Sequence, residues 1–120
     1  MKTLLVVEDE DKLRLLYKKE LSEEGYNVLT VASGEEALEK MHQHPVDLVI
    51  LDIKLGGMSG LEALEEMLIK KRDLKVVINT AYSSYKDDFS SWLADAYLVK
   101  SSDLDELKDT VKRLLEEKKH

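Results

Sequence analysis

The feature that most constrains the fold of this chain is a regular alternation between two kinds of segment. Short apolar runs alternate with longer segments in which apolar residues recur every three or four positions. The short runs are Leu4–Val7, Val28–Val31, Asp47–Leu51, Lys75–Asn79 and Ala96–Val99. Most are apolar on successive residues, which is typical of strands buried on both faces of a sheet. The alternation predicts a (βα)5 fold, an α/β structure in which helices cover both faces of a doubly wound, five-stranded parallel sheet.

The longer segments carry the periodicity of amphipathic helices. Their apolar faces are Leu13, Leu16, Tyr17 and Leu21; Ala37, Leu38 and Met41; Leu61, Leu64 and Leu68; and Leu104, Leu107, Val111 and Leu114. A capping residue stands three positions before an acid at Ser33, Ser59 and Asp103, which predicts helix starts at these points. A further helix, predicted at Ser84–Leu93, is expected to be the weakest, because Ser, Asp and aromatic residues are mediocre helix formers.

Two signals predict where the first helices end. Gly25 and Asn27 follow the first helical segment, and both residue types are common just past the end of a helix. The second helix is expected to end near His44, because the residue before a proline avoids the helical region and Pro45 comes next.

Composition narrows the class of protein. The 120 residues are enough for one domain, 1–120, and 43% hydrophobic with 36% charged residues describes a soluble globular chain. Without Cys there is no disulfide or thiolate chemistry, which suits a reducing cytoplasm. A net charge of −7 argues against direct nucleic-acid binding, which needs clustered Lys and Arg. No apolar run approaches the roughly 20 residues that span a bilayer.

Charged and polar side chains follow four of the predicted strands. Glu8–Asp11 follows the first strand, Asp52 the third and Lys100 the fifth, while Thr80 lies at the end of the fourth. An open parallel sheet binds ligands beyond the carboxyl ends of its strands, at the topological switch point. Each residue alone could be a helix cap or a solvated loop residue. Together they predict a site of carboxylates, one hydroxyl and one cation.

The residue types at this site indicate phosphoryl chemistry assisted by magnesium. Clustered carboxylates repel one another unless a cation joins them, and hard oxygen ligands suit Mg²⁺. Asp52, flanked by apolar residues and placed beside a metal and a lysine, is a candidate nucleophile toward phosphorus. Mg²⁺ and Lys100 would neutralise a transferring phosphoryl group, and Thr80 would donate a hydrogen bond to it. His42 and His44 are expected to face different sides of a helix as surface residues, which argues against zinc.

Four pieces of the chain, in this order and at these spacings, make it resemble the receiver domain of two-component response regulators. The pieces are Leu4–Glu10, Asp47–Gly60, Val76–Ala81 and Asp95–Lys100. The resemblance covers essentially the whole chain and implies a flavodoxin-like, CheY-like three-layer sandwich. It also implies a cytoplasmic signalling phosphoacceptor rather than an enzyme.

The resemblance implies a role for each matching residue of the site. Asp52 resembles the phosphoacceptor, which takes its phosphoryl group from a phosphohistidine on a histidine kinase or a histidine phosphotransfer protein. Asp9 resembles the direct Mg²⁺ ligand and Glu8 the acid that holds metal-bound water. The backbone carbonyl of Lys54 stands where the family completes the metal shell, and Lys100 resembles the lysine that pairs with the phosphoryl group.

The resemblance also implies a switch and an output face. Thr80 and Tyr97 resemble the switch pair, in which the hydroxyl moves to the phosphoryl group and the aromatic ring turns inward. The family's usual output face combines the fourth helix, the fifth strand and the fifth helix, so Ser84–Leu93 and Asp95–Tyr97 belong to it here. The face would control a downstream protein that the sequence does not name. A monomer or a weak homodimer is expected.

Three positions depart from the family pattern. Glu8 stands where Asp is more usual, which a water-mediated ligand tolerates, and Gly56 replaces a common Pro. Ser101 replaces the Pro whose bond to the lysine is cis in the family, and a cis Lys100–Ser101 bond would cost roughly 3 kcal/mol. We therefore expect this loop to depart from the usual geometry and to aim Lys100 less rigidly.

Two bulky residues bear on the lifetime of the phosphorylated state. Lys54 and Tyr82 lie two residues after the phosphoacceptor and the switch hydroxyl, respectively. We expect both side chains to flank the path of an attacking water, and thereby to shield the acyl phosphate and slow the loss of phosphate.

Three other functions fit the sequence less well. A phosphatase that uses an aspartyl-phosphate generally needs a second acid two residues after the nucleophile, where this chain has Lys54. A flavodoxin-like cofactor protein needs a phosphate-cradling loop after the first strand, where Glu8–Asp11 repels phosphate. A pseudo-receiver, which binds partners without being phosphorylated, is the alternative that Ser101 leaves open. The chain is expected to be either a stand-alone signalling domain or part of a longer regulator.

Overall fold

The computed structural model describes residues 1–53, 60–81 and 93–117, and these contain a five-stranded parallel sheet. The strands are β1 (Thr3–Val7), β2 (Asn27–Val31), β3 (Leu48–Leu51), β4 (Lys75–Thr80) and β5 (Ala96–Val99). The helices are α1 (Asp11–Glu23), α2 (Gly34–Gln43), α3 (Gly60–Lys70) and α4 (Asp105–Glu116). The strand order β2-β1-β3-β4-β5, with each pair parallel, confirms the predicted α/β fold. Of the helix predicted at Ser84–Leu93, all but Leu93 lies outside the described residues.

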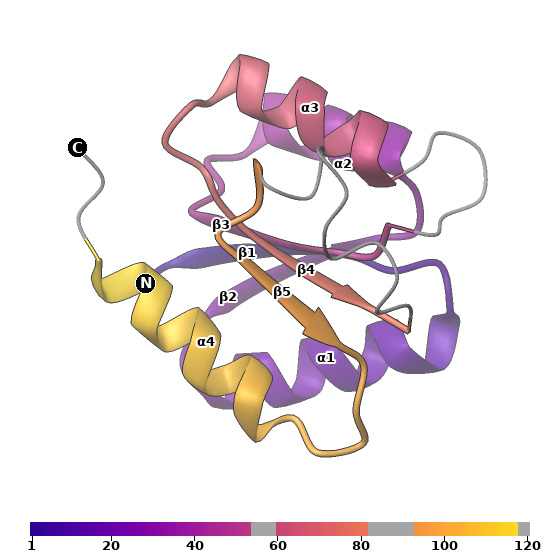
Figure 1. The fold of residues 1–120 in the computed structure, drawn as a ribbon, viewed down its shortest axis with the longest axis vertical. Coiled ribbons are helices and arrows are strands. Elements are labelled where there is room, and N and C mark those ends of the chain that lie inside the picture. Colours follow the sequence, from indigo (N-terminus) through magenta and orange to yellow (C-terminus); the bar gives the residue numbers. More distant parts are fainter. Residues whose placement is uncertain (54–59, 82–92, 118–120) are drawn as a thin grey trace.

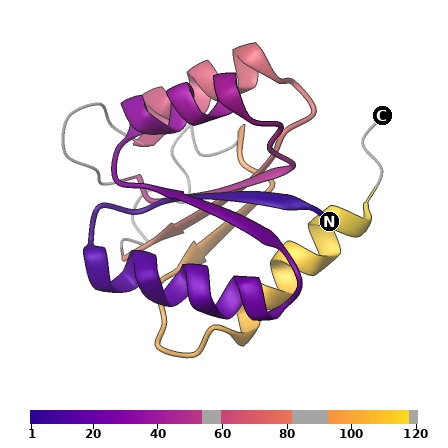
Figure 2. The same ribbon diagram turned by 180° about the vertical axis from the view of Figure 1, so that it is seen from behind.

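The described helices form one layer on each side of the sheet. Figure 1 shows α2 and α3 together on one face and α1 and α4 on the other, and Figure 2 shows the same layers from behind. None of the helices in the described ranges is both long enough and apolar enough to cross a bilayer.

One apolar core lies on each face of the sheet, between the strands and the helices. There are two cores because successive residues of a strand face opposite sides of the sheet. The α2/α3 core takes Leu5, Val7, Val49, Leu51, Val76 and Ile78 from the central strands. The α1/α4 core takes Leu4, Val6, Leu48, Ile50 and Val77. All of these side chains are at most 2% exposed. This burial on both faces explains the unbroken apolar runs of the sequence and holds the strand ends in register.

The predicted apolar faces of the helices are confirmed with one exception, on α1. Tyr17 and Leu21 are 2% and 1% exposed, and Leu13 packs beside them on the α1/α4 core. Leu16, which was expected on the same face, is 39% exposed. At 100° per residue, Leu16 lies about 100° from the centre of the stripe formed by the other three residues. The prediction for Leu16 is therefore wrong.

The predicted helix boundaries agree with the backbone geometry at α1 and α2, while α4 begins one residue later than predicted. Ser33 caps α2, and its hydroxyl oxygen accepts a hydrogen bond from the Glu36 amide at 3.2 Å. At α4 the N-cap position falls on Leu104 rather than on Asp103, but the Asp103 carboxylate accepts a hydrogen bond from the Asp105 amide at 2.9 Å. Ser59 lies outside the described residues. The helix ends fall where expected, with α1 ending at Glu23 and α2 at Gln43.

Gly60 begins α3 directly against the backbone that follows β3. A Cβ atom at this position would lie 2.3 Å from the carbonyl oxygen of Asp52 and 2.5 Å from the Cα of Ile53. The Gly60 amide also donates a hydrogen bond to the Ile53 carbonyl at 3.0 Å. The chain therefore needs glycine here for the close approach of two backbone segments.

We expect Gly60→Ala to lower the free energy of unfolding by about 3 kcal/mol, because the new methyl group overlaps backbone atoms that cannot turn away. Gly25→Ala is the matched control. Gly25 has φ +96° with open space around its Cβ position, so only the left-handed conformation is penalised, by about 1 kcal/mol. Urea unfolding measures both values, and equal losses would contradict the close approach at Gly60.

Candidate functional site

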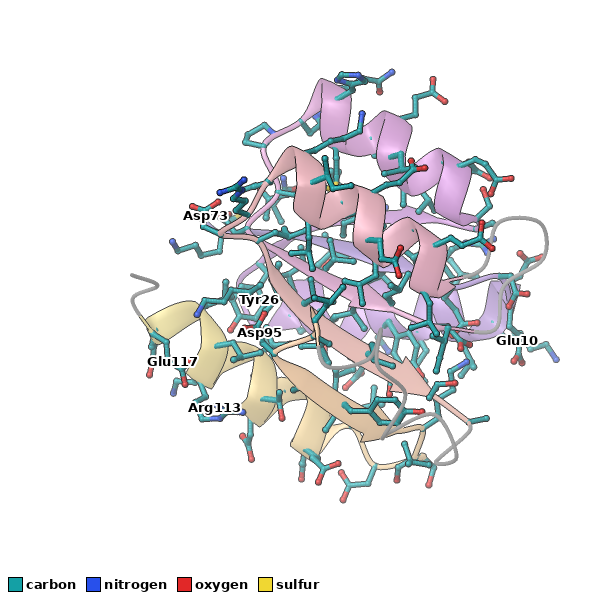
Figure 3. The ribbon with its side chains drawn as sticks, turned by 45° about the horizontal axis from the view of Figure 1, so that its top comes forward. Glu10, Tyr26, Asp73, Asp95, Arg113 and Glu117 are labelled. Carbon is teal, nitrogen blue, oxygen red and sulfur yellow. The ribbon has the colours of Figure 1, made fainter. Side chains whose placement is uncertain are left out.

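The predicted site residues gather at the carboxyl ends of the strands. Glu8 and Asp9 follow β1, Asp52 follows β3, Thr80 ends β4 and Lys100 follows β5. The chain reverses its direction of winding at β1, which lies between β2 and β3 and so makes this end the topological switch point. Figure 3 shows this end of the sheet on the side of Glu10, while Asp73 and Glu117 mark the opposite end.

The Lys100 ammonium lies between two buried carboxylates. Its Nζ atom is 2.7 Å from Asp52 Oδ2 and 2.7 Å from Glu8 Oε1. Glu8 is 2% exposed and Asp52 is 6% exposed, so both carboxylates have lost most of their hydration. The second oxygen of Glu8 accepts a hydrogen bond from the Glu10 amide at 3.1 Å. These contacts replace the water that the buried charges have lost.

A third carboxylate makes the site negative overall. Glu8, Asp9 and Asp52 each offer one oxygen atom, and these atoms all lie within 4.8 Å of one another. Asp9 is exposed, so one side of the cluster opens to solvent. Three carboxylates face one ammonium, and a small hard cation such as Mg²⁺ suits both the excess negative charge and the oxygen donors. Lys54, whose carbonyl was expected in the metal shell, lies outside the described residues.

Burial and pairing shift the two innermost ionisable groups. Burial raises the pKa of the Glu8 carboxyl, although the hydrogen bond from Lys100 acts in the opposite direction. Burial tends to lower the pKa of Lys100, but its hydrogen bonds to Asp52 and Glu8 outweigh this effect and raise it above the usual value. Lys100 therefore stays protonated at neutral pH, while the ionised form of Glu8 is unfavourable without a further cation.

Thr80 and Tyr97 lie on neighbouring strands beside this cluster. Thr80 is fully buried, and its carbonyl accepts a hydrogen bond from the Lys100 amide at 2.7 Å. Tyr97 is half-buried on β5 and pairs in register with Ile78, two positions before Thr80. Side chains two positions apart share one face of a strand, so the hydroxyl and the ring lie on the same side of the sheet.

A match to a known family decides what kind of domain carries this arrangement. The model of the response regulator receiver domain matches residues 4–112, which is most of the chain. The chain belongs to the response regulator receiver domains. A receiver of this kind is a signalling phosphoacceptor of two-component systems rather than an enzyme.

Individual relatives agree with this assignment. The receiver is 33% identical over 114 residues to sporulation initiation phosphotransferase F of Bacillus subtilis, covering 93% of this chain and 92% of that protein. It is 35% identical over 117 residues to response regulator ArlR of Staphylococcus aureus, covering 96% of this chain and 53% of ArlR. The chain thus spans about half the length of ArlR.

Solved structures of receivers have the same fold as this chain. TrrA of Thermotoga maritima, in complex with Mg(2+)-BeF, superposes on the receiver with a TM-score of 0.92 at 54% identity, covering 95% of this chain and 99% of that one. TrrA in complex with the histidine kinase ThkA superposes with a TM-score of 0.90 at 55% identity, covering 96% and 99%.

The loop after β5 departs from the usual family geometry at the Lys100–Ser101 bond, as its sequence predicts. The described residues contain no cis peptide bond, so the Lys100–Ser101 bond is trans. The Ser101 hydroxyl oxygen accepts a hydrogen bond from the Asp103 amide at 3.1 Å, which turns the chain toward α4. Even so, Lys100 reaches both buried carboxylates. Gly56 and Tyr82, two other positions singled out from the sequence, lie outside the described residues.

Sequence reasoning missed one residue that supports the receiver site. Arg14 on α1 donates a hydrogen bond from Nη1 to the Glu8 carbonyl at 2.9 Å and forms an ion pair with Asp11. A lone Arg on a helix face carries no local signal of such a contact.

The reasoning about the histidines was partly wrong. Both are exposed, as expected, but α2 ends at Gln43 and His44 is extended, so they do not face different sides of a helix. His42 and His44 line the same surface pocket, together with Lys70 and Lys71.

We expect Lys100→Met to lower the free energy of unfolding at pH 7 by about 3 kcal/mol, because Glu8 and Asp52 then remain buried without their cation. The loss should shrink as the pH falls toward 5. A carboxyl whose pKa is raised on folding contributes most to stability below its unfolded pKa, and this contribution is lost as the pH rises. Urea unfolding between pH 5 and 8 measures the effect.

Lys108→Met is the matched control for this prediction. Lys108 forms an ion pair with Glu20 at 2.8 Å near the surface, where solvent screens the charges, so the loss should be smaller. A Lys100 variant that loses no more stability than the Lys108 variant would contradict the account of the buried pairs.

Proposed function

We propose that this receiver takes a phosphoryl group from a phosphohistidine onto Asp52 and changes a protein-interaction face in response. The observation that carries the proposal is the buried Asp52 carboxylate held 2.7 Å from Lys100, with carboxylate oxygens of Glu8 and Asp9 within 4.8 Å. A positioned carboxylate between a lysine and a divalent cation is suited to attack phosphorus.

The residues that would hold Mg²⁺ are Glu8, Asp9, Asp52 and the backbone carbonyl of Lys54. Oxygen donors of this kind fit Mg²⁺, which keeps several of its waters when only a few carboxylates bind it. The structure of TrrA contains Mg²⁺ and BeF, which supports the same cofactor here. When bound, the ion would neutralise the excess negative charge of the cluster and of an incoming phosphoryl group.

In the proposed transfer, a carboxylate oxygen of Asp52 attacks the phosphorus atom of phosphohistidine. An O–P bond forms, the N–P bond breaks, and the departing imidazole takes up a proton. Lys100 binds an oxygen of the phosphoryl group, and the Thr80 hydroxyl donates a hydrogen bond to another. Tyr97 turns inward as Thr80 moves, which couples the site to the surface around β5.

The phosphoryl donor would be a histidine kinase or a histidine phosphotransfer protein. TrrA has been solved in complex with the histidine kinase ThkA, which supports a partner of this class. The output face would combine Ser84–Leu93, β5 and α4, and it would act on a downstream protein without direct contact to nucleic acid or membrane. We propose a cytoplasmic monomer or weak homodimer, with 1–120 as one receiver domain.

The direct test is phosphorylation by acetyl phosphate in the presence of Mg²⁺, followed by intact mass measurement. We expect the mass of one phosphoryl group to be gained by the wild type and to be lost in Asp52→Asn or after Mg²⁺ is chelated. Asp47→Asn is the matched control, because Asp47 lies at the other end of β3 and binds the Thr3 amide instead. A folded wild type that gains no mass would favour a phosphorylation-independent interaction module.

The lifetime of the phosphorylated state gives a second test. If Lys54 and Tyr82 shield the acyl phosphate, Lys54→Asn and Tyr82→Ala should each speed hydrolysis by severalfold, because water then reaches the phosphorus atom more easily. Decay of the phosphorylated mass after removal of the donor measures this rate. Tyr26→Ala, at the opposite end of the sheet (Figure 3), is the control, and rates equal to it would refute the shielding.

A further inference from the structure

A buried polar pair lies at the edge of the α1/α4 core, next to the site. Asn79 Nδ2 on β4 donates a hydrogen bond to the Tyr17 hydroxyl oxygen on α1 at 3.1 Å. Tyr17 is 2% exposed and Asn79 is 6% exposed. Val77, two positions earlier on the same face of β4, belongs to the apolar α1/α4 core, so Asn79 takes a position that a leucine could fill. Replacing both partners by apolar residues of similar size would leave the free energy of unfolding nearly unchanged. The pair therefore suggests a role other than stability.

In the described sheet, the last two residues of β4 pair with only one neighbouring strand. The pairing of β4 with β3 ends at Ile78, opposite Leu51, so Asn79 and Thr80 extend past that neighbour. On the other side these residues pair with Leu98 and Val99 of β5, which is a half-exposed edge strand. Within the described residues, the hydrogen bond to Tyr17 joins the Asn79 side chain at this end of β4 to α1.

Two groups of the proposed phosphoryl site depend on this strand end. Thr80 follows Asn79 directly and points to the opposite face of the sheet, so a shift of Asn79 turns the Thr80 hydroxyl with it. The Thr80 carbonyl accepts the hydrogen bond from the Lys100 amide at 2.7 Å, which ties the backbone of Lys100 to the same point. The Tyr17 hydroxyl lies near enough for the charges of the pocket to act on its pKa, which burial raises.

We propose that Tyr17 is a positioning residue for phosphorylation. Through its hydrogen bond to Asn79 it fixes the end of β4, and thereby places the Thr80 hydroxyl and the Lys100 backbone for the transfer. This inference rests on the proposed function, in which Asp52 accepts the phosphoryl group. Tyr17 does not touch the reacting atoms, so its effect belongs to the rate of transfer rather than to the binding of Mg²⁺.

The decisive variant is the double substitution Tyr17→Phe/Asn79→Leu, which removes both polar groups and keeps the core filled. We expect its urea midpoint to stay close to that of the wild type and its Mg²⁺ affinity, measured by calorimetry, to be unchanged. The rate constant of phosphorylation by acetyl phosphate at saturating Mg²⁺ should fall about tenfold, because small misplacements at a reacting centre are costly. A double variant that reacts at the wild-type rate would overturn the proposal.

Two further variants separate positioning from stability. Tyr17→Phe alone leaves the Asn79 amide buried without its partner, so it should lose stability and slow phosphorylation to the same degree as the double variant. Leu21→Ala removes apolar contacts one turn further along α1 and leaves the pair intact, so it should lose stability and react at the wild-type rate. Equal slowing in Leu21→Ala would show that the rate follows stability, and would overturn the proposal.

Phosphorylation of the wild type separates a failure of the proposed function from a failure of the role of Tyr17. Failure of the wild type to gain a phosphoryl group would overturn the proposed function itself. A wild type that is phosphorylated, together with a double variant of equal rate, would overturn only the role of Tyr17.

Discussion

The ammonium group of Lys100 is the one cation that faces the buried acids in the described part of this receiver. Asp52 and Glu8 each hold it at 2.7 Å, and without it two desolvated carboxylates would repel each other across the carboxyl ends of β1 and β3. The pairing leaves the cluster negative, since Asp9 adds a third carboxylate. The contacts with Lys100 therefore offset the repulsion between the two buried carboxylates, and the negative charge that remains suits the proposed Mg²⁺ ion.

The sheet supplies the rigidity that this arrangement of charges requires. The three acids follow neighbouring strands, and β1 and β3 are held by apolar cores on both faces, so Glu8 and Asp52 move little relative to each other. The neighbouring end of β4 is different, because it extends past β3 and borders an edge strand. A polar contact from α1, through Tyr17, adds at this end a directional link that apolar packing cannot provide.

Much of the fold could be predicted from local patterns, because unbroken apolar runs and helical periodicity report burial directly. The position of the site followed from topology, since acids after parallel strands converge at one edge. Leu16 was placed wrongly because an apolar residue at the border of a helical stripe can face either way. The hydrogen bond between Tyr17 and Asn79 has no local signal, because its partners are 62 positions apart in the sequence. The sequence predicts Lys100 as a site residue, but only the structure shows that its ammonium group contacts both Glu8 and Asp52.

The contact at Gly60 has a consequence for how receivers of this kind can diversify. Ile53 and Gly60 are the described residues on either side of the segment 54–59, and the backbone hydrogen bond between them places the two ends of that segment side by side. For a flexible segment whose ends are held together in this way, each doubling of its length costs only about 0.6 kcal/mol of closure entropy. Receivers can therefore differ in the sequence of this segment, provided that Gly60 and the proposed metal-binding carbonyl at position 54 are kept.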